Sequence, residues 1–312
     1  MRRVLAPTSF YHVGGSMPAN TSSYVPRQAD QELLAHVCAG DVCTVLTSRQ
    51  MGKSSLMAHT VKALQKKRLR SVVIDLTAII AHNMTAEAFY AGLIHAFIQQ
   101  LKLPVRLDQW WQAHALLSPV QRLTDFVTQE VLPRVQRRLA VFIDEIDAML
   151  QLDFADDFFA ALRAFYNDRA QHSALKRLTF VLLGAVAPQD LIQDRTRTPF
   201  NIGTRIELTD FIVEEADKLT AGWPFCDQKR ARGLARVLHW TGGQPYLTHK
   251  VCATLATDAP QDGEEPAVDA LIQTLFFGDA TWSDPHLGYI RDRMVGSKAD
   301  PAALLALYSD LL

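Results

Sequence analysis

The stretch TSRQMGKSS, residues 47–55, decides the fold because it lies between a predicted strand and a predicted helix. A triphosphate bound at such a junction needs backbone N–H groups around its phosphates, a lysine that reaches them and a hydroxyl group for magnesium. Gly52, Lys53 and Ser54 supply the last three positions of the pattern GxxxxGK[ST]. The residues predicted to bind a nucleotide in this loop are Gln50, Met51, Gly52, Lys53, Ser54 and Ser55.

Thr47 stands where the pattern has its first glycine. A β-branched residue restricts the backbone, so the loop must begin in an allowed conformation and cannot depend on the freedom of glycine. The stretch also has an ordinary alternative, a helix that starts with Ser48 as its cap and leaves Lys53 in solvent. A second motif is needed to choose between the two.

The second motif is LAVFIDEID, residues 139–147, an apolar run that ends in Asp144 and Glu145. An aspartate at the carboxyl end of a buried strand can hold Mg²⁺, so Asp144 and Ser54 are the predicted metal-binding residues. The adjacent Glu145 can orient and deprotonate an attacking water. The ordinary alternative is a turn in which Asp147 caps the next helix, and this is compatible with the site. The predicted catalytic residues are Glu145, Lys53 and Asp144.

Short apolar runs alternate with helical patterns through the first two thirds of the chain. Strands that are apolar throughout are typical of a parallel sheet covered by helices on both faces. In such a sheet both motifs emerge at the carboxyl ends of strands, where ligands bind. The sequence therefore predicts an α/β fold, the three-layer parallel sheet of P-loop nucleoside triphosphatases. The expected strands are VCTVLTS (42–48), SVVIDLT (71–77), LAVFIDEID (139–147), LTFVLLGAV (178–186) and TRIELTD (204–210).

The strand pattern ends at about Phe211, and helical patterns follow. This change in pattern predicts a domain boundary. We expect an extended N-terminal arm over residues 1–25, a P-loop ATPase domain over 26–212, and an all-helical lid domain with C-terminal helices over 213–312.

The composition is that of a globular protein, with 48% hydrophobic and 21% charged residues among 312. The formal net charge of -1 gives no global reason to expect nucleic acid as the main partner. Two local basic runs, KKRLR (66–70) and RVQRR (134–138), leave nucleic acid open. Cations at helix C-termini are also ordinary partners of the helix dipole.

The cysteines and the apolar runs indicate a cytoplasmic protein. The four cysteines lack CxxC pairing, so reduced thiols are expected. The N-terminal stretch MRRVLAPTSF has too short an apolar run for a secretory signal. The longest apolar run, residues 178–187, is about half of what a membrane helix requires, so we expect no membrane span.

The chain resembles the AAA-like ATPase modules related to the STAND class, the signal-transduction ATPases with numerous domains, which are common in bacterial multidomain proteins. That class tolerates a residue other than glycine where Thr47 stands. The resemblance covers nearly the whole chain. The segments that carry it are YVPRQADQELL (24–34), LTSRQMGKSSL (46–56), VIDLT (73–77), FIDEID (142–147), TPFNIG (198–203) and WTGGQPYLT (240–248).

This resemblance implies an ATP-driven switch with an ADP-bound resting state and an ATP-bound active state. It implies that Arg27 lies near the adenine or ribose and that Pro245 closes over the base from the lid. From the residues alone, Arg27 could instead pair with Asp30 or Glu32, and Pro245 could simply occupy the first turn of a helix.

Two further roles stay open. A sensor residue should follow the strand over 178–186, but Ala185 and Ala187 offer no polar group there. Arg195 or Arg197 could supply a cationic finger, in this chain or to a neighbouring subunit, or could belong to a solvated basic turn.

The leading hypothesis is a regulatory ATPase that uses ATP, ADP and Mg²⁺ and works with protein partners or additional domains outside this chain. One rival is a nucleic-acid-handling ATPase, such as an origin-recognition or transposition helper. The other is a nucleotide-binding interaction module with negligible turnover.

Overall fold

The computed structural model describes residues 10–18, 20–186, 203–257, 265–277 and 284–295. The chain divides into two compact units, one formed by Gly14–Asp210 and the other by Met1–Val13 with Phe211–Leu312. Arg195, Arg197, Ala187 and all but the last residue of the TPFNIG stretch lie outside the described residues.

The first unit is built on a five-stranded sheet in which every pair of neighbours is parallel. The strand order is β2-β3-β4-β1-β5, so the chain crosses over between strands that are not consecutive in sequence. The expected parallel α/β fold is confirmed. The strands are β1 (Cys43–Leu46), β2 (Arg70–Asp75), β3 (Leu139–Asp144), β4 (Leu178–Gly184) and β5 (Thr204–Arg205).

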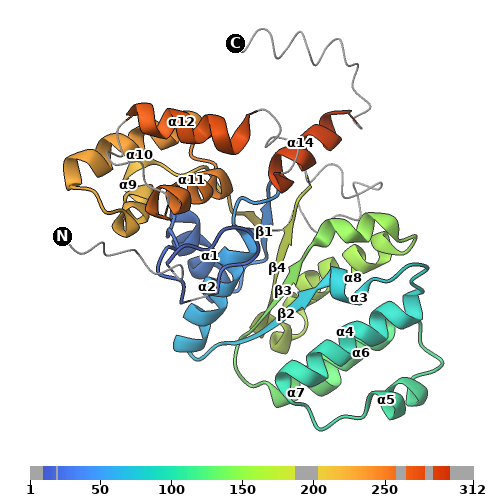
Figure 1. The fold of residues 1–312 in the computed structure, drawn as a ribbon. Coiled ribbons are helices and arrows are strands. Elements are labelled where there is room, and N and C mark those ends of the chain that lie inside the picture. Colours follow the sequence, from blue (N-terminus) through green and yellow to red (C-terminus); the bar gives the residue numbers. More distant parts are fainter. Residues whose placement is uncertain (1–9, 19, 187–202, 258–264, 278–283, 296–312) are drawn as a thin grey trace. The chain divides into compact units, whose positions relative to one another are not determined.

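The strands β1, β3 and β4 are mostly apolar because both faces of the sheet are covered there (Figure 1). Every residue of β1, β3 and β4 is buried. Side chains alternate between two core clusters: Val141 and Ile143 pack with α4 and α8, whereas Ala140 and Phe142 pack with α1 and α2. The helices of this unit are α1 (Gln28–Ala39), α2 (Lys53–Lys66), α3 (Leu76–Ile79), α4 (Ala86–Leu101), α5 (Leu107–Ala113), α6 (Pro119–Asp125), α7 (Leu132–Arg134) and α8 (Ala155–Asn167).

The edge strand β5 is shorter than its sequence suggests. TRIELTD predicts a strand over 204–210, but only Thr204 and Arg205 pair with β1 as a strand. Ile206 and Leu208 are nevertheless buried, and the backbone N–H of Ile206 still donates to the carbonyl of Thr44 at 2.8 Å. Every second residue from Ile206 to Leu208 is buried, which is the pattern of a strand at the edge of a sheet. The sequence therefore predicted a strand that continues beyond Arg205.

The second unit is helical, and it contains no strand among its described residues. Its 3-10 helix Asp217–Gly222 receives a hydrogen bond from the N-terminal segment, because the Tyr11 hydroxyl donates to the carbonyl of Leu219 at 2.5 Å. Trp223 lies buried in the core and donates to the carbonyl of Cys252 at 2.9 Å. The helices of this unit are α9 (Val213–Ala216), α10 (Asp227–Thr241), α11 (Pro245–Thr257), α12 (Glu265–Phe276) and α14 (Pro285–Val295).

Two other expectations concern the thiols and the membrane. Cys38, Cys43, Cys226 and Cys252 are all free thiols. In the part of the chain that the structure describes, no helix has both the length and the apolar character to cross a bilayer.

Candidate functional site

The loop over residues 47–52 joins β1 to α2 at the carboxyl end of the sheet. The N–H of Thr47 donates to the carbonyl of Gly184 at 3.2 Å, which extends the pairing of β1 with β4 by one residue. The loop then turns through positive φ at Gln50 (62°) and at Gly52 (90°), and α2 begins at Lys53. Thr47 itself is not among the residues with positive φ, so its side chain fits a position where the pattern has glycine.

The start of α2 offers backbone donors to an anion. The first intrahelical bond runs from the N–H of Leu56 to the carbonyl of Gly52, at 2.9 Å. The N–H groups of the preceding residues belong to the first turn, where a helix has no internal acceptor for them. Gly52, not Ser48, is the N-cap. This end of the helix therefore has both the donors and the positive dipole that phosphate binding requires.

Lys53 is buried, with only 7% of its surface exposed. Its ammonium donates to the carbonyls of Thr47 and Ser48, at 3.0 and 2.8 Å. Burial lowers the pKa of Lys53, while the nearby carboxylates of Glu145 and Asp144 act in the opposite direction. An ammonium has three donors, so one remains for a phosphate oxygen after the two loop carbonyls are counted. Lys53 is thus a cation held inside the loop, and the solvated alternative is wrong.

Ser54 and Asp144 come together across the gap between α2 and β3. The hydroxyl of Ser54 donates to a carboxylate oxygen of Asp144 at 2.9 Å, and the other oxygen accepts from the N–H of Glu145 at 3.0 Å. Asp144 is 6% exposed, and burial raises its pKa despite these two hydrogen bonds. The pair presents a hydroxyl and a carboxylate, which are hard oxygen donors of the kind that Mg²⁺ prefers.

Glu145 adopts a left-handed conformation with φ of 55°. This conformation is uncommon for a residue other than glycine and is found at strained functional positions. Burial raises the pKa of the Glu145 carboxyl, and the negative charges of Asp147 and Asp144 raise it further. A carboxylate with a raised pKa is a stronger proton acceptor than an exposed one.

Arg27 precedes α1 and reaches the loop over residues 47–52. Its guanidinium, in a residue 5% exposed, donates to the carbonyl of Thr209 at 3.1 Å. A Cβ atom placed on Gly52 would lie 2.9 Å from the Nη2 atom of Arg27, so the guanidinium packs directly on the loop. The carboxylate of Asp30 accepts the backbone N–H of Arg27 at 2.8 Å, so Asp30 contacts Arg27 through the main chain.

The other predicted nucleotide-binding residues are placed as follows. Met51 is buried at 7% exposure, and the Ser55 hydroxyl accepts the N–H of Met17 at 3.1 Å. Pro245 belongs to the helical unit, where it begins α11 as the ordinary alternative describes. Its predicted role towards a base stays a prediction.

Two further carboxylates lie near the site: Asp147, which the sequence predicted as a helix cap, and Asp75, which received no role. Asp147 does not cap a helix; its carboxylate accepts the N–H of Ala185 at 2.9 Å. Asp75 lies opposite Asp144 in the register of β2 with β3, and its charge adds to the raised pKa of Asp144. The signal for Asp75 was its place at the end of an apolar run, the same signal that identified Asp144.

The AAA-like domain family model matches residues 12–276. An uncharacterized WD repeat-containing protein of Synechocystis sp. is 39% identical over 316 aligned residues, which cover 97% of this chain but 26% of that protein. The chain therefore spans about a quarter of the length of this curated relative.

Solved structures resemble this chain at low sequence identity, and one of them has a TM-score above 0.5. A Walker-type ATPase of Pyrococcus abyssi matches with a TM-score of 0.57 at 16% identity, over 94% of this chain and 91% of that one. An ORC2 protein of Aeropyrum pernix, solved with ADPNP and ADP, matches with a TM-score of 0.49 at 14% identity, over 86% of this chain and 72% of that one. The fold is that of the P-loop ATPases, and the family model extends over most of the sequence. The chain belongs to the AAA-like domain family.

Proposed function

We propose that this chain binds ATP with Mg²⁺ at the loop before α2 and hydrolyses it slowly. The observation that carries the proposal is the 2.9 Å hydrogen bond between the Ser54 hydroxyl and the Asp144 carboxylate, beside the buried ammonium of Lys53. The backbone donors of Gly52 to Ser55 would surround the phosphates, and Lys53 would neutralise charge on the β and γ groups. Arg27, packed on Gly52, would lie near the adenine or ribose.

Ser54 and Asp144 fit a magnesium ion. Among the described residues, no group of three or more His, Cys, Asp or Glu side chains forms a metal site. Mg²⁺ is often held by one or two protein oxygens together with substrate phosphates and water, so a pair is sufficient. When bound, the ion would supply positive charge to the phosphate oxygens.

Glu145 would act as the base of the reaction. Its carboxylate would orient a water molecule and accept a proton from it as the water attacks the γ phosphate. The raised pKa of the Glu145 carboxyl supports this role, because the proton affinity of a base limits how well it assists the attack. Asp144 would keep the hydroxyl of Ser54 in position.

We further propose that hydrolysis resets a conformational state, as in the STAND class. The support is the resemblance in sequence and the curated relative, which contains WD repeats and is about four times as long as the matched region. WD repeats form propellers that serve as interaction platforms. In such a protein an ATPase module would control a repeat domain, and protein partners or additional domains would read its nucleotide state.

The test compares Lys53→Ala with Lys66→Ala, which removes an exposed lysine from the other end of the same helix. We expect Lys53→Ala to weaken ATP binding about a hundredfold or more, because a buried charge-assisted contact to phosphate is lost. Lys66→Ala should bind as the parent does. Equal ATP affinity in all three proteins, measured by calorimetry with magnesium present, would refute the site.

Turnover separates the proposal from its rivals. Release of phosphate that requires Lys53 supports an ATPase, whereas tight binding without any release would make the chain a nucleotide-binding interaction module. Stimulation of turnover by DNA, with a steep dependence on salt, would favour a nucleic-acid-handling ATPase.

A further inference from the structure

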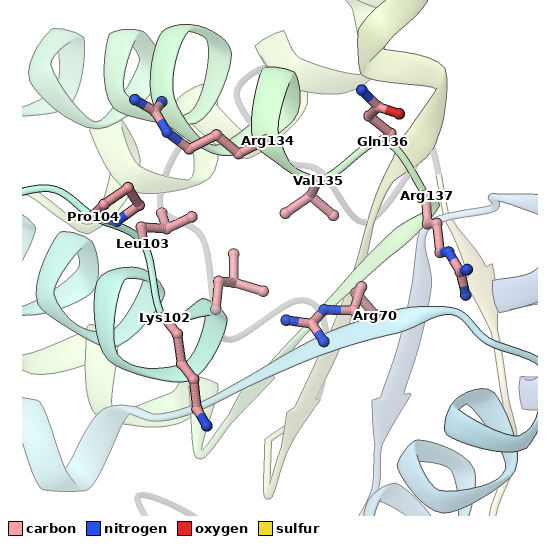
Figure 2. Close-up of a pocket in the computed structure, with 9 residues that line it drawn as sticks. Arg70, Lys102, Leu103, Pro104, Arg134, Val135, Gln136 and Arg137 are labelled. Atoms are coloured by element: carbon pink, nitrogen blue, oxygen red, sulfur yellow. The ribbon is translucent and has the colours of Figure 1, made fainter.

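A pocket lies at the edge of the sheet where the strands begin, opposite the edge that holds Lys53 and Asp144 (Figure 2). Arg70 is the first residue of β2, and Arg137 precedes the first residue of β3 by two positions. Because β3 has six residues, this edge lies roughly 20 Å from Asp144 at the other end of the strand. The pocket has a volume of about 490 Å³ and is lined by Arg70, Leu101, Lys102, Leu103, Pro104, Arg134, Val135, Gln136 and Arg137.

The lining contains four cations and no carboxylate. The cations come from three separate segments. Arg70 begins β2, Lys102 follows α4, and Arg134 and Arg137 lie in the segment from the end of α7 to the start of β3. Two of them are held by neighbours: Arg134 pairs with Glu130 at 2.5 Å, and Arg137 donates to the carbonyl of Arg68 at 3.2 Å. Within the described chain, Arg70 and Lys102 have no carboxylate partner. The pocket therefore carries positive charge that the carboxylates of the described residues neutralise only in part, at Arg134.

Helix dipoles explain part of this charge. Lys102 is the C-cap of α4 and Arg134 is the last residue of α7, so each lies where a cation is favourable. Arg70 begins a strand and Arg137 lies beyond the end of α7, so neither one compensates a helix end in this way. Helix dipoles therefore do not account for the positive charges of Arg70 and Arg137 in this pocket.

The walls between the cations are aliphatic. Leu101, Leu103 and Val135 are buried members of the core, and Figure 2 shows Leu103 and Val135 facing the middle of the pocket. No aromatic side chain lines the hollow, and Gln136 is the one uncharged polar side chain among the lining residues. Recognition here would depend on charge, with an apolar surface against the body of the ligand.

We propose that this pocket binds a small phosphate-bearing molecule of about nucleotide size that carries two or more negative charges. Its volume falls within the range of small-molecule sites. Guanidinium groups match phosphate oxygens with two parallel hydrogen bonds, and three arginines line the hollow. The cations converge on one hollow, which suits a compact anion better than a long chain. The proposal is independent of the ATP site at the other edge.

The experiment uses pyrophosphate as the probe and amide hydrogen exchange of the full chain as the readout. Protection should appear in residues 100–106 and 134–139, two segments that contain the lining residues 101–104 and 134–137. Residues 47–56 report the ATP site separately, so failure at one location does not imply failure at the other. The test variant is Arg70→Gln with Lys102→Gln. The matched control is Lys66→Gln with Lys67→Gln, which removes two exposed cations from outside the pocket.

The test variant should need about tenfold more pyrophosphate, or more, for half-maximal protection of the pocket segments, because two charge-assisted contacts are lost. The control should match the parent, and both variants should keep the parental unfolding midpoint since the four side chains are exposed. Absence of protection in the parent would overturn the proposal. Equal weakening in both variants would also overturn it, since that result indicates diffuse surface charge.

Two other ligands test which class of anion the pocket binds. An oligothymidylate that protects the pocket at lower concentration than pyrophosphate would assign it to a nucleic acid backbone and overturn the small-molecule proposal. Hexaglutamate that protects as well as pyrophosphate would assign it to an acidic polypeptide, with the same consequence. Preference for pyrophosphate over both supports the proposal.

Discussion

The carboxylate of Asp147 accepts a hydrogen bond from the backbone N–H of Ala185 at 2.9 Å, and this bond ties the turn after β3 to the end of β4. The two segments approach closely at Gly184, where a Cβ would lie 2.6 Å from Cγ2 of Ile146 and 3.0 Å from Oδ1 of Asp147. Glu145 precedes this contact by two residues, in its left-handed conformation. The proposed base is therefore held between a buried strand and a fixed turn.

Glu145→Gln should retain ATP binding and lose turnover. The amide has the size of the carboxylate and leaves the backbone unchanged, but it cannot accept a proton from water. We expect the affinity for ATP to stay within a few fold and phosphate release to fall by about a hundredfold or more. Single-turnover measurement of phosphate release checks this, and hydrolysis at the parental rate would exclude Glu145 as the base.

The pH dependence of turnover should change in Asp147→Asn. Burial raises the pKa of Glu145, and the charge of Asp147 raises it further. The base works when deprotonated, so turnover should rise with pH as Glu145 loses its proton. Removing the negative charge of Asp147 lowers the pKa of Glu145, so this rise should move to lower pH.

The asparagine oxygen can still accept the N–H of Ala185, so the substitution tests charge with little change in geometry. The profile of kcat against pH is the measurement. A rise that stays at the same pH, or one that moves to higher pH, would contradict the assignment of this rise to Glu145.

The fold could be predicted from sequence because the two motifs and the strand pattern agree. Runs of buried residues such as Leu139–Asp144 indicate a covered parallel sheet, and its topology brings Ser54 and Asp144 to one edge. The reason why Thr47 fits the first position of the pattern came only from the structure, where the loop takes its positive φ angles at Gln50 and Gly52.

Contacts between distant segments could not be predicted. Nothing in the local sequence of Asp147 indicates that it binds Ala185, and nothing near Arg27 indicates Thr209, since each pair depends on tertiary packing. The basic pocket is a similar case. KKRLR and RVQRR are separate runs in sequence, but Arg70, Arg134 and Arg137 line one hollow with Lys102 because β2 and β3 are neighbours.

Arg27→Ala should uncouple the loop over residues 47–52 from the end of the α/β unit. The guanidinium packs on Gly52 and donates to the carbonyl of Thr209, directly before the boundary at Asp210. We expect ATP to alter amide exchange in residues 205–210 of the parent and to lose this effect in the variant. Binding should weaken about tenfold, as for loss of one buried polar contact.

Gln28→Ala is the control for Arg27→Ala, because the adjacent Gln28 is exposed. Its exchange response to ATP should equal that of the parent. If Arg27→Ala also leaves the response of residues 205–210 intact, Arg27 does not connect the loop to this segment.

Gly243→Ala and Gly242→Ala should differ sharply in their effect on the helical unit. Both glycines have positive φ, 79° and 59°, so each substitution carries a backbone cost of about 1–2 kcal/mol. A Cβ on Gly243 would lie 2.3 Å from the carbonyl oxygen of Phe211, whereas a Cβ on Gly242 meets nothing within 4 Å. The N–H of Phe211 also donates to the carbonyl of Gly243 at 2.8 Å, so neither backbone can move away without loss of a bond.

Gly243→Ala should therefore reduce the free energy of unfolding of the helical unit by roughly 1–3 kcal/mol more than Gly242→Ala does. The urea dependence of amide exchange in α10 and α11 measures this difference without interference from the α/β unit. Equal losses in the two variants would mean that backbone conformation alone sets the cost. The contact between Phe211 and Gly243 would then be loose enough to accept a methyl group, contrary to the 2.3 Å approach of a Cβ to the carbonyl oxygen of Phe211.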